Sequence, residues 1–220
     1  MATAPNQLYS WDLTYLPSNI KGVFFYLYMF MDVFSRKIVG WQVYECESSA
    51  NAAQILKDIC QHEGIARHQV VLHSDNGTPM KGLSMLAMMQ TLGVVPSFSR
   101  PSVSDDNPYS EALFRTVKYA PQYPGYFNGV KSARVYFERF VYWYNEQHCH
   151  SGIKFVTPAQ RHRGEDEVIL KKRKQVFERA KMPHPERWNG RATRNWERIA
   201  TVHLNPEKGK TQNPVLAEAA

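Results

Sequence analysis

The sequence predicts an α/β fold in which helices flank a mixed five-stranded sheet. Three strand-like segments, at about residues 9–16, 23–32 and 37–44, follow one another closely near the start. Two more, at about 70–73 and 94–98, alternate with helical segments. Adjacent strands in the sequence favour antiparallel pairing, whereas strand–helix–strand alternation favours parallel pairing, so both kinds should occur in one sheet.

The strand assignments depend on residue type and on turn signals. Residues 1–7 have the composition of a linker that leads into the first strand. The segments 23–32 and 37–44 are rich in aromatic and β-branched residues. The short connection Phe34-Ser35-Arg36 between them predicts an antiparallel pair.

Helices are predicted where capping residues precede apolar periodicity. Ser48 or Ser49 can cap a helix that runs to about Glu63. Residues 80–92 read as a helix that is apolar nearly all round, so it should be buried. Asn107 is expected to cap a further helix with Pro108 at its first position, and residues 131–146 form a strongly aromatic helix. We therefore expect one folded core over residues 8–165 and an extension over residues 166–220.

Charge is distributed unevenly along the chain. The net charge is +7 and the pI is about 9.3, which favours an anionic partner such as a nucleic acid. Residues 1–153 carry 12 basic and 12 acidic side chains, whereas residues 154–210 carry 15 basic and 7 acidic ones. The basic character therefore belongs to the C-terminal extension.

Cysteine usage and hydropathy indicate a soluble protein of a reducing cytoplasm. Cys46, Cys60 and Cys149 are few, odd in number and far apart, which argues against a disulfide framework. No signal peptide is visible at the N-terminus, and the most apolar run covers only residues 23–31. A membrane span needs about 20 apolar residues, so we expect no membrane association.

Three carboxylates stand out as candidates for a metal site: Asp12, Asp75 and Glu111. Each has an ordinary structural explanation, as a residue on the solvent face of a strand, in a turn, or in the favourable first turn of a helix. Brought together, they would repel one another unless a hard divalent cation such as Mg²⁺ neutralised them. Asp32 is a competing acid, which we interpret as a structural partner of Arg36.

The spacing and the surrounding motifs resemble a known family. Asp75 and Glu111 are separated by 35 residues, and Lys118 follows Glu111 by seven. This pattern resembles the D,D-35-E core shared by retroviral integrases and bacterial insertion-sequence-3 transposases. The motifs that resemble the transposases are Trp11-Asp12-Leu13-Thr14-Tyr15, Met31-Asp32-Val33-Phe34-Ser35-Arg36, His73-Ser74-Asp75-Asn76-Gly77, Ser99-Arg100-Pro101, Asn107-Pro108-Tyr109-Ser110-Glu111, Tyr144-Asn145, His150 and Thr157-Pro158.

The resemblance implies a ribonuclease-H-like fold and metal-dependent DNA chemistry. It implies two Mg²⁺ ions, with Mn²⁺ as a substitute, held by Asp12, Asp75 and Glu111. Such cores break a DNA strand at the ends of the element and pass the freed 3′-OH to a target phosphodiester. Two ends must be held together, so the resemblance also implies a homo-oligomer, at least a dimer.

Candidate DNA contacts fall into two groups. By the resemblance, Lys118 would contact DNA near the scissile phosphate, with Arg115 and Asn76 as neighbours, and Asn76 would also shape the turn that holds Asp75. In the extension, the run Lys171-Lys172-Arg173-Lys174 is expected to contact the phosphate backbone, with some base stacking by Trp188 and Trp196. The alternatives are a solvated helix face and a docking surface for a second subunit.

The function that these features predict is that of a transposase catalytic core. Two alternatives stay open: a metal-dependent nuclease that does not join strands, and a truncated DNA-binding inhibitor of transposition. Full-length members of the family carry an N-terminal helix-turn-helix region that recognises the ends of the element. This chain is expected to be an excised or truncated core that begins after that region.

Overall fold

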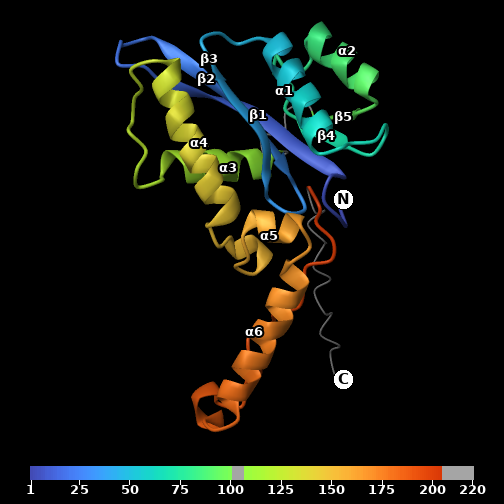
Figure 1. The fold of residues 1–220 in the computed structure, drawn as a ribbon, viewed down its shortest axis with the longest axis vertical. Helices are drawn as coiled ribbons and strands as arrows, with labels where there is room; N and C mark the ends of the chain where they lie inside the picture. The colour runs from blue at the N-terminus through green and yellow to red at the C-terminus, as the bar shows by residue number, and fades with distance from the viewer. Residues whose placement is uncertain (101–106, 205–220) are drawn as a thin grey trace, which may run out of the picture.

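A mixed five-stranded sheet forms the centre of the molecule (Figure 1). The computed structural model describes residues 1–100 and 107–204. The strand order is β3-β2-β1-β4-β5. β1 pairs antiparallel with β2 and parallel with β4, β2 pairs antiparallel with β3, and β4 pairs parallel with β5. The strands are β1 (Leu8–Pro17), β2 (Phe24–Asp32), β3 (Ile38–Tyr44), β4 (Val71–Ser74) and β5 (Val95–Phe98). The predicted fold class is confirmed.

Both faces of the sheet are covered, which explains why β2 is almost continuously apolar. Tyr28 and Phe30 belong to the core on one face, together with α1 and α2. Leu27 and Met29 belong to the core on the other face, together with α3 and α4. Because successive side chains of a strand point to opposite faces, a strand between two helical layers needs apolar residues at every position. The helices are α1 (Ser49–His62), α2 (Leu83–Leu92), α3 (Pro108–Lys118) and α4 (Val130–Glu146).

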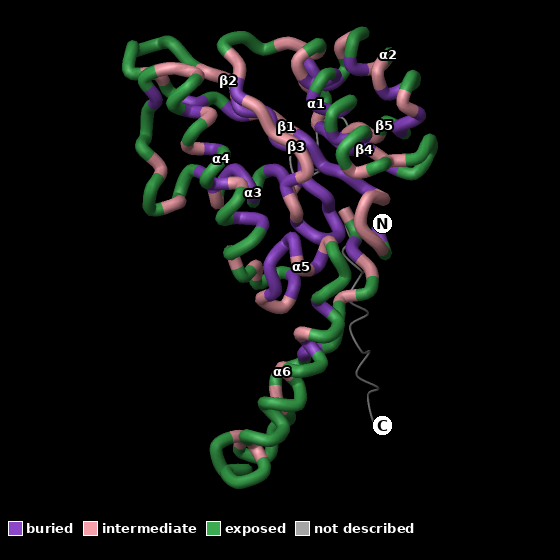
Figure 2. The backbone as a smooth tube through the Cα atoms, viewed as in Figure 1, coloured by how far each residue is buried: buried purple, intermediate pink, exposed green. Residues whose placement is uncertain are grey.

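The expectation that the helix at 80–92 is buried is wrong. The helix begins at Leu83, after Gly82, and only Met85 and Met89 on it are buried. Leu83 is 85% exposed. Helix α2 packs beside α1 and β5 at the outer edge of that face, so its far side meets solvent (Figure 2). The apolar composition of this segment therefore did not predict its burial, which depends on how many elements surround the helix.

The C-terminal part leaves the core and returns to it. α5 (Pro158–His162) leads into α6 (Asp166–Lys181), which projects away from the sheet (Figure 1). Beyond the short η3 (Pro185–Trp188), the chain comes back and Val202 forms a two-hydrogen-bond bridge with Ala2. The first seven residues, expected as a linker, thus include a buried alanine held against the C-terminal segment.

A buried ion pair fixes the base of α6. Arg161 and Asp166 are both fully buried, and their side chains form an ion pair with Nη1 and Oδ2 3.3 Å apart. Arg161 also donates to the carbonyls of Phe34 and Ile199, while Arg198 donates to Asp166. These bonds tie the β2–β3 turn, α5, α6 and the returning segment together.

In the described part of the chain, no helix has the length and apolar character to cross a membrane.

Candidate active site

The pairing of β1 with β4 brings two of the predicted carboxylates to neighbouring positions. In this parallel pair, Leu8 lies opposite Val71 and Ser10 lies opposite His73. Extended by two residues, the same register places Asp12 opposite Asp75, which directly follows the end of β4. Neighbouring strands lie about 4.8 Å apart, so the backbones of Asp12 and Asp75 lie close to each other in space.

A buried polar cluster fixes α3 on the same side of β1. Ser10 and Asp12 share a face of β1, because side chains two residues apart point the same way. The Ser10 hydroxyl donates to Asn107 Oδ1 and lies 2.7 Å from the Ser110 hydroxyl. Asn107 in turn donates from Nδ2 to the Trp11 carbonyl at 3.2 Å. The start of α3, with Glu111 in its first turn, is thereby attached beside Asp12.

This attachment corrects the role expected for Asn107. Asn107 occupies the N-cap position and Pro108 the first position of α3, as predicted. The Asn107 side chain, however, makes no capping hydrogen bond. It is fully buried and its amide is used to bind β1 instead.

The electrostatics of Asp12 show that the three acids interact. Burial is the main cause that raises the pKa of Asp12 to about 7, and the Leu13 backbone N–H, which donates to Asp12 Oδ1 at 2.7 Å, acts in the opposite direction. The negative charges of Asp75 and Glu111 raise this pKa further, whereas Lys118 lowers it. Asp12 is therefore within electrostatic reach of both predicted partners and of the predicted lysine.

The donor set suits a hard divalent cation. Three carboxylates provide oxygen ligands of the kind that Mg²⁺ prefers, and their mutual repulsion would be relieved by it. Within residues 1–100 and 107–204, no three His, Cys, Asp or Glu side chains are already closed around a single metal position. Asp75 Oδ1 instead accepts a hydrogen bond from the Ser99 hydroxyl at 3.0 Å.

The residues predicted to contact DNA around this site have distinct surroundings. Asn76 donates from Nδ2 to the Ser99 carbonyl at 2.8 Å, which ties the end of β4 to the segment after β5 and so shapes the turn that carries Asp75. Arg115 and Lys118 are exposed on α3. The Arg115 guanidinium carbon lies 6.0 Å from the centre of the Tyr119 ring.

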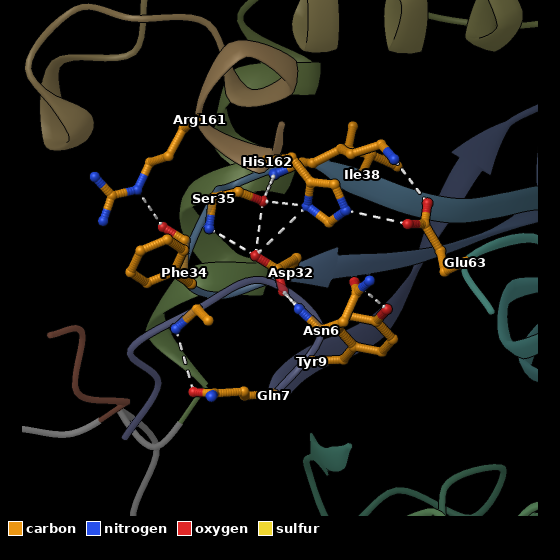
Figure 3. Close-up of polar contacts among 12 residues, drawn as sticks. Asn6, Gln7, Tyr9, Asp32, Phe34, Ser35, Ile38, Glu63, Arg161 and His162 are labelled. Carbon is orange, nitrogen blue, oxygen red and sulfur yellow. Dashed lines mark hydrogen bonds and ion pairs between the residues drawn. The ribbon is translucent and has the colours of Figure 1, made fainter. Parts of the chain in front are cut away.

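Asp32 is not the partner of the Arg36 side chain, so that expectation is wrong. Figure 3 shows Asp32 at the centre of a different network. Its Oδ1 accepts from the backbone N–H and the hydroxyl of Ser35, and its Oδ2 accepts from the Asn6 backbone N–H at 2.8 Å. The Arg36 guanidinium lies over the Tyr109 ring instead, 4.0 Å from its centre.

The same network contains a Ser–His–Glu arrangement that the sequence did not reveal. Ser35 Oγ lies 2.9 Å from His162 Nδ1, and His162 Nε2 lies 3.1 Å from Glu63 Oε2 (Figure 3). The spacing is that of a nucleophile, a base and an acid, but Ser35 has no exposed surface and its hydroxyl also bonds to Asp32. The arrangement is structural, since no substrate can reach this serine.

We expect Glu63→Gln to destabilise the protein by about 2 kcal/mol at pH 7, with the loss shrinking as the pH falls from about 4.5 to about 2. The hydrogen bond to His162 is the main cause that lowers the pKa of Glu63 to about 2, aided by Lys37. A carboxylate whose folded pKa is lowered adds stability above its unfolded pKa, and this stability is lost as the pH falls through the folded value. Urea denaturation at pH 7 and pH 3 measures it; an equal loss at both would contradict the assignment.

The C-terminal basic run has a mixed role. Arg173 donates to the Lys154 carbonyl at 2.8 Å and lies 5.7 Å from the Trp196 ring centre, so it stabilises the extension itself. Trp196 is 7% exposed and packs in a small core with Leu170. The expectation that Trp196 stacks on bases is therefore wrong. Lys171 and Lys172 are exposed.

The strand order defines a ribonuclease-H-like core. Asp12 lies on the central strand β1, Asp75 follows the adjacent parallel strand β4, and Glu111 lies on the covering helix α3. Two family models, both described as "Integrase core domain", match residues 2–104 and 92–158. Together the two models span residues 2–158, and the predicted resemblance to an integrase core domain is confirmed at this level.

Curated relatives are transposases of insertion sequences. The chain is 29% identical over 161 residues to the transposase for insertion sequence element IS904 of Lactococcus lactis, covering 71% of this chain and 61% of that protein. It is 26% identical over 164 residues to a putative transposase for element IS986/IS6110 of Mycobacterium tuberculosis, covering 71% and 58%. The chain thus spans about 60% of the length of these relatives.

Solved structures share the fold. A simian T-cell lymphotropic virus intasome chain matches with a TM-score of 0.59 and 17% identity, covering 73% of this chain and 55% of that chain. The HTLV-2 integrase catalytic core domain in complex with magnesium matches with a TM-score of 0.55 and 13% identity, covering 74% and 99%.

Proposed function

We propose that this chain is the catalytic core of an insertion-sequence transposase, of the insertion-sequence-3 type, that cleaves DNA and transfers the freed 3′-OH to a target strand. The observation that carries the proposal is geometric: the register of β1 and β4 places Asp12 opposite Asp75, and the buried cluster of Ser10, Asn107 and Ser110 attaches α3, which carries Glu111, beside them. The family match, the named relatives and the motif spacing agree with it.

In this proposal Asp12, Asp75 and Glu111 hold two Mg²⁺ ions, for which Mn²⁺ can substitute. When bound, these ions would activate the attacking oxygen and stabilise the leaving oxygen in an in-line displacement. The HTLV-2 core with the same fold was solved in complex with magnesium, which supports a divalent cation here.

The chain's own residues prepare this site. Ser99 and Asn76 orient the Asp75 carboxylate and its turn, while the Ser10–Asn107–Ser110 cluster sets where α3 presents Glu111. Lys118, whose charge acts on Asp12, would bind a DNA phosphate near the reacting strand, with Arg115 beside it on α3. No protein nucleophile is required, because the attacking group belongs to water or to DNA.

Two further features belong to the proposal. Two DNA ends must react together, so the active form is at least a dimer; the HTLV-2 core was solved in dimeric and trimeric forms. The free thiols of Cys46, Cys60 and Cys149 suit the reducing cytoplasm that we propose as its location.

The test is a strand-transfer assay on a labelled, pre-cleaved duplex that carries the end sequence of the element, with Mg²⁺, Mn²⁺ or EDTA. Products longer than the input that require the metal support the proposal. Only shorter, metal-dependent products would identify a nuclease. A gel shift that is independent of metal, with uncut DNA, would identify a DNA-binding inhibitor.

We expect the double variant Lys171→Ala/Lys172→Ala to weaken DNA binding uniformly across sequences. Two exposed lysines that contact phosphates release about two counterions, so the slope of log affinity against log salt should become shallower by about 1.8. Fluorescence anisotropy with a labelled duplex from low to moderate salt measures this slope. Lys57→Ala on the exposed side of α1 is the matched control and should leave it unchanged. An unchanged slope in the double variant would assign these lysines to a solvated face.

A further inference from the structure

A cavity of about 330 Å³ lies between the β2–β3 turn, α3 and the end of α4. Its size is at the lower end of the roughly 300–1,000 Å³ typical of ligand pockets. Most of its lining is apolar, and no Asp or Glu of the described chain contributes to it. The lining residues used below are Arg36, Tyr109, Leu113, Thr116, Tyr144 and His150.

Among the residues that the structure describes, Arg36 is a buried cation without a counter-ion. Arg36 is only 9% exposed, and its Nη1 atom is fully buried with no hydrogen-bond partner among the described residues. Within the described residues, the guanidinium makes no ion pair, and its one specific contact is the face of the Tyr109 ring. A guanidinium carries five N–H donors, and leaving them unpaired away from water is costly.

The backbone also indicates that this position is maintained for a purpose. Arg36 has φ of 69°, in the left-handed region that residues with a side chain rarely adopt. Such local strain clusters at functional positions. The strained turn directs a charged side chain into an apolar cavity, where a structural residue would more simply be an uncharged one.

The remaining polar groups of the lining favour an anion. Burial is the main cause that lowers the pKa of His150 to about 4, with Arg36 adding to it, so the imidazole is neutral at pH 7. Its Nδ1 accepts from the Gly152 backbone N–H at 3.0 Å, which leaves its proton on Nε2 as a donor. The Tyr144 hydroxyl has no hydrogen-bond partner among the described residues, so it is a further donor.

We propose that this cavity binds a carboxylate attached to an apolar body, with the Arg36 guanidinium pairing with the carboxylate. The planar guanidinium fork matches two carboxylate oxygens, and the apolar lining by Leu113 and its neighbours suits the rest of the ligand. A phosphate has no apolar body to fill the apolar part of this cavity. The carboxylate can come from a free organic acid or from an Asp or Glu side chain of a polypeptide.

Benzoate is the probe, with benzyl alcohol as its uncharged counterpart. We expect benzoate to shift the amide resonances of α3 and the β2–β3 turn in NMR titrations of the full chain, and benzyl alcohol to bind at least about tenfold more weakly. Arg36→Met should weaken benzoate binding by a similar factor. It should also raise the Tm of the ligand-free protein by a few degrees, because it removes an unpaired buried charge.

Further variants and a peptide probe separate the guanidinium fork, the charge alone and the source of the carboxylate. Arg36→Lys retains the charge without the fork and should bind benzoate with intermediate affinity, whereas Lys57→Met on α1 should bind like the parent chain. A short peptide that contains Asp beside Phe distinguishes a polypeptide source from a free acid. Equal binding of benzoate and benzyl alcohol, undiminished binding in Arg36→Met, tighter binding of inorganic phosphate, or no binding of either carboxylate would each overturn it.

Discussion

Glu111→Gln is expected to lower the rate of strand transfer by at least about 10²–10³-fold and to leave the fold intact. The substitution keeps the shape of the side chain and removes the negative charge that a hard cation requires. Glu111 is exposed in the first turn of α3, so its replacement should change the Tm by no more than a few degrees.

Glu138→Gln is the matched control for this experiment. Glu138 is likewise an exposed glutamate on a helix that covers the sheet, but it lies on α4. Asp75→Asn should reproduce the effect of Glu111→Gln, since both acids act on Asp12. A Glu111→Gln protein that retains more than about a tenth of the parent rate would contradict the assignment of this residue.

Asp12→Asn is expected to stabilise the metal-free protein at pH 8 by about 2–4 kcal/mol while it abolishes activity. The folded pKa of about 7 lies above the reference value of 3.8, mainly because of burial. The folded state therefore binds more protons than the unfolded state between these values. Its stability contribution is complete below about pH 4 and is lost as the pH rises through about 7. An asparagine keeps the oxygen that accepts from Leu13 and carries no charge.

Urea denaturation in EDTA at several values of pH between 4 and 8 measures this difference. The gap between Asp12→Asn and the parent protein should widen with pH and level off above about 7. At pH 8, Mg²⁺ should raise the Tm of the parent and not that of the variant, since binding to the folded state alone stabilises it. A gap that is the same at every pH would show that folding does not raise the pKa of Asp12.

Much of the fold followed from local pattern. The short connection between β2 and β3, the Ser48 cap of α1 and the alternation of later strands and helices are all local features. The burial of α2 was not predictable in this way, because its composition says nothing of how many elements surround it. Part of the network around Asp32 also depends on residues far along the chain, since His162 reaches Ser35 only through the packing of α5.

The spacing of the acids and the motifs around them predicted the candidate site. The hydrogen bonds that hold its elements together could not be predicted in this way. Asp75 and Glu111 could be identified because 35 residues separate them and because a lysine, Lys118, follows Glu111 by seven residues. The bonds by which Ser10 attaches Asn107 and Ser110 to β1 join residues about 100 positions apart, and no pattern in the sequence marks them. That Arg36 has no ion-pair partner within residues 1–100 and 107–204 could not be predicted either, because the sequence offered Asp32 as a nearby partner.

The most direct test of the central claim is a crystal structure of the chain with Mn²⁺ and a pre-cleaved duplex, using anomalous scattering to locate the metal. We expect at least one Mn²⁺ peak within bonding distance of carboxylate oxygens of Asp12 and Asp75, with Glu111 completing the site beside the DNA phosphate. The same crystals of Asp12→Asn should lack that peak. Mn²⁺ bound elsewhere on the chain, or bound equally without the Asp12 charge, would contradict the account.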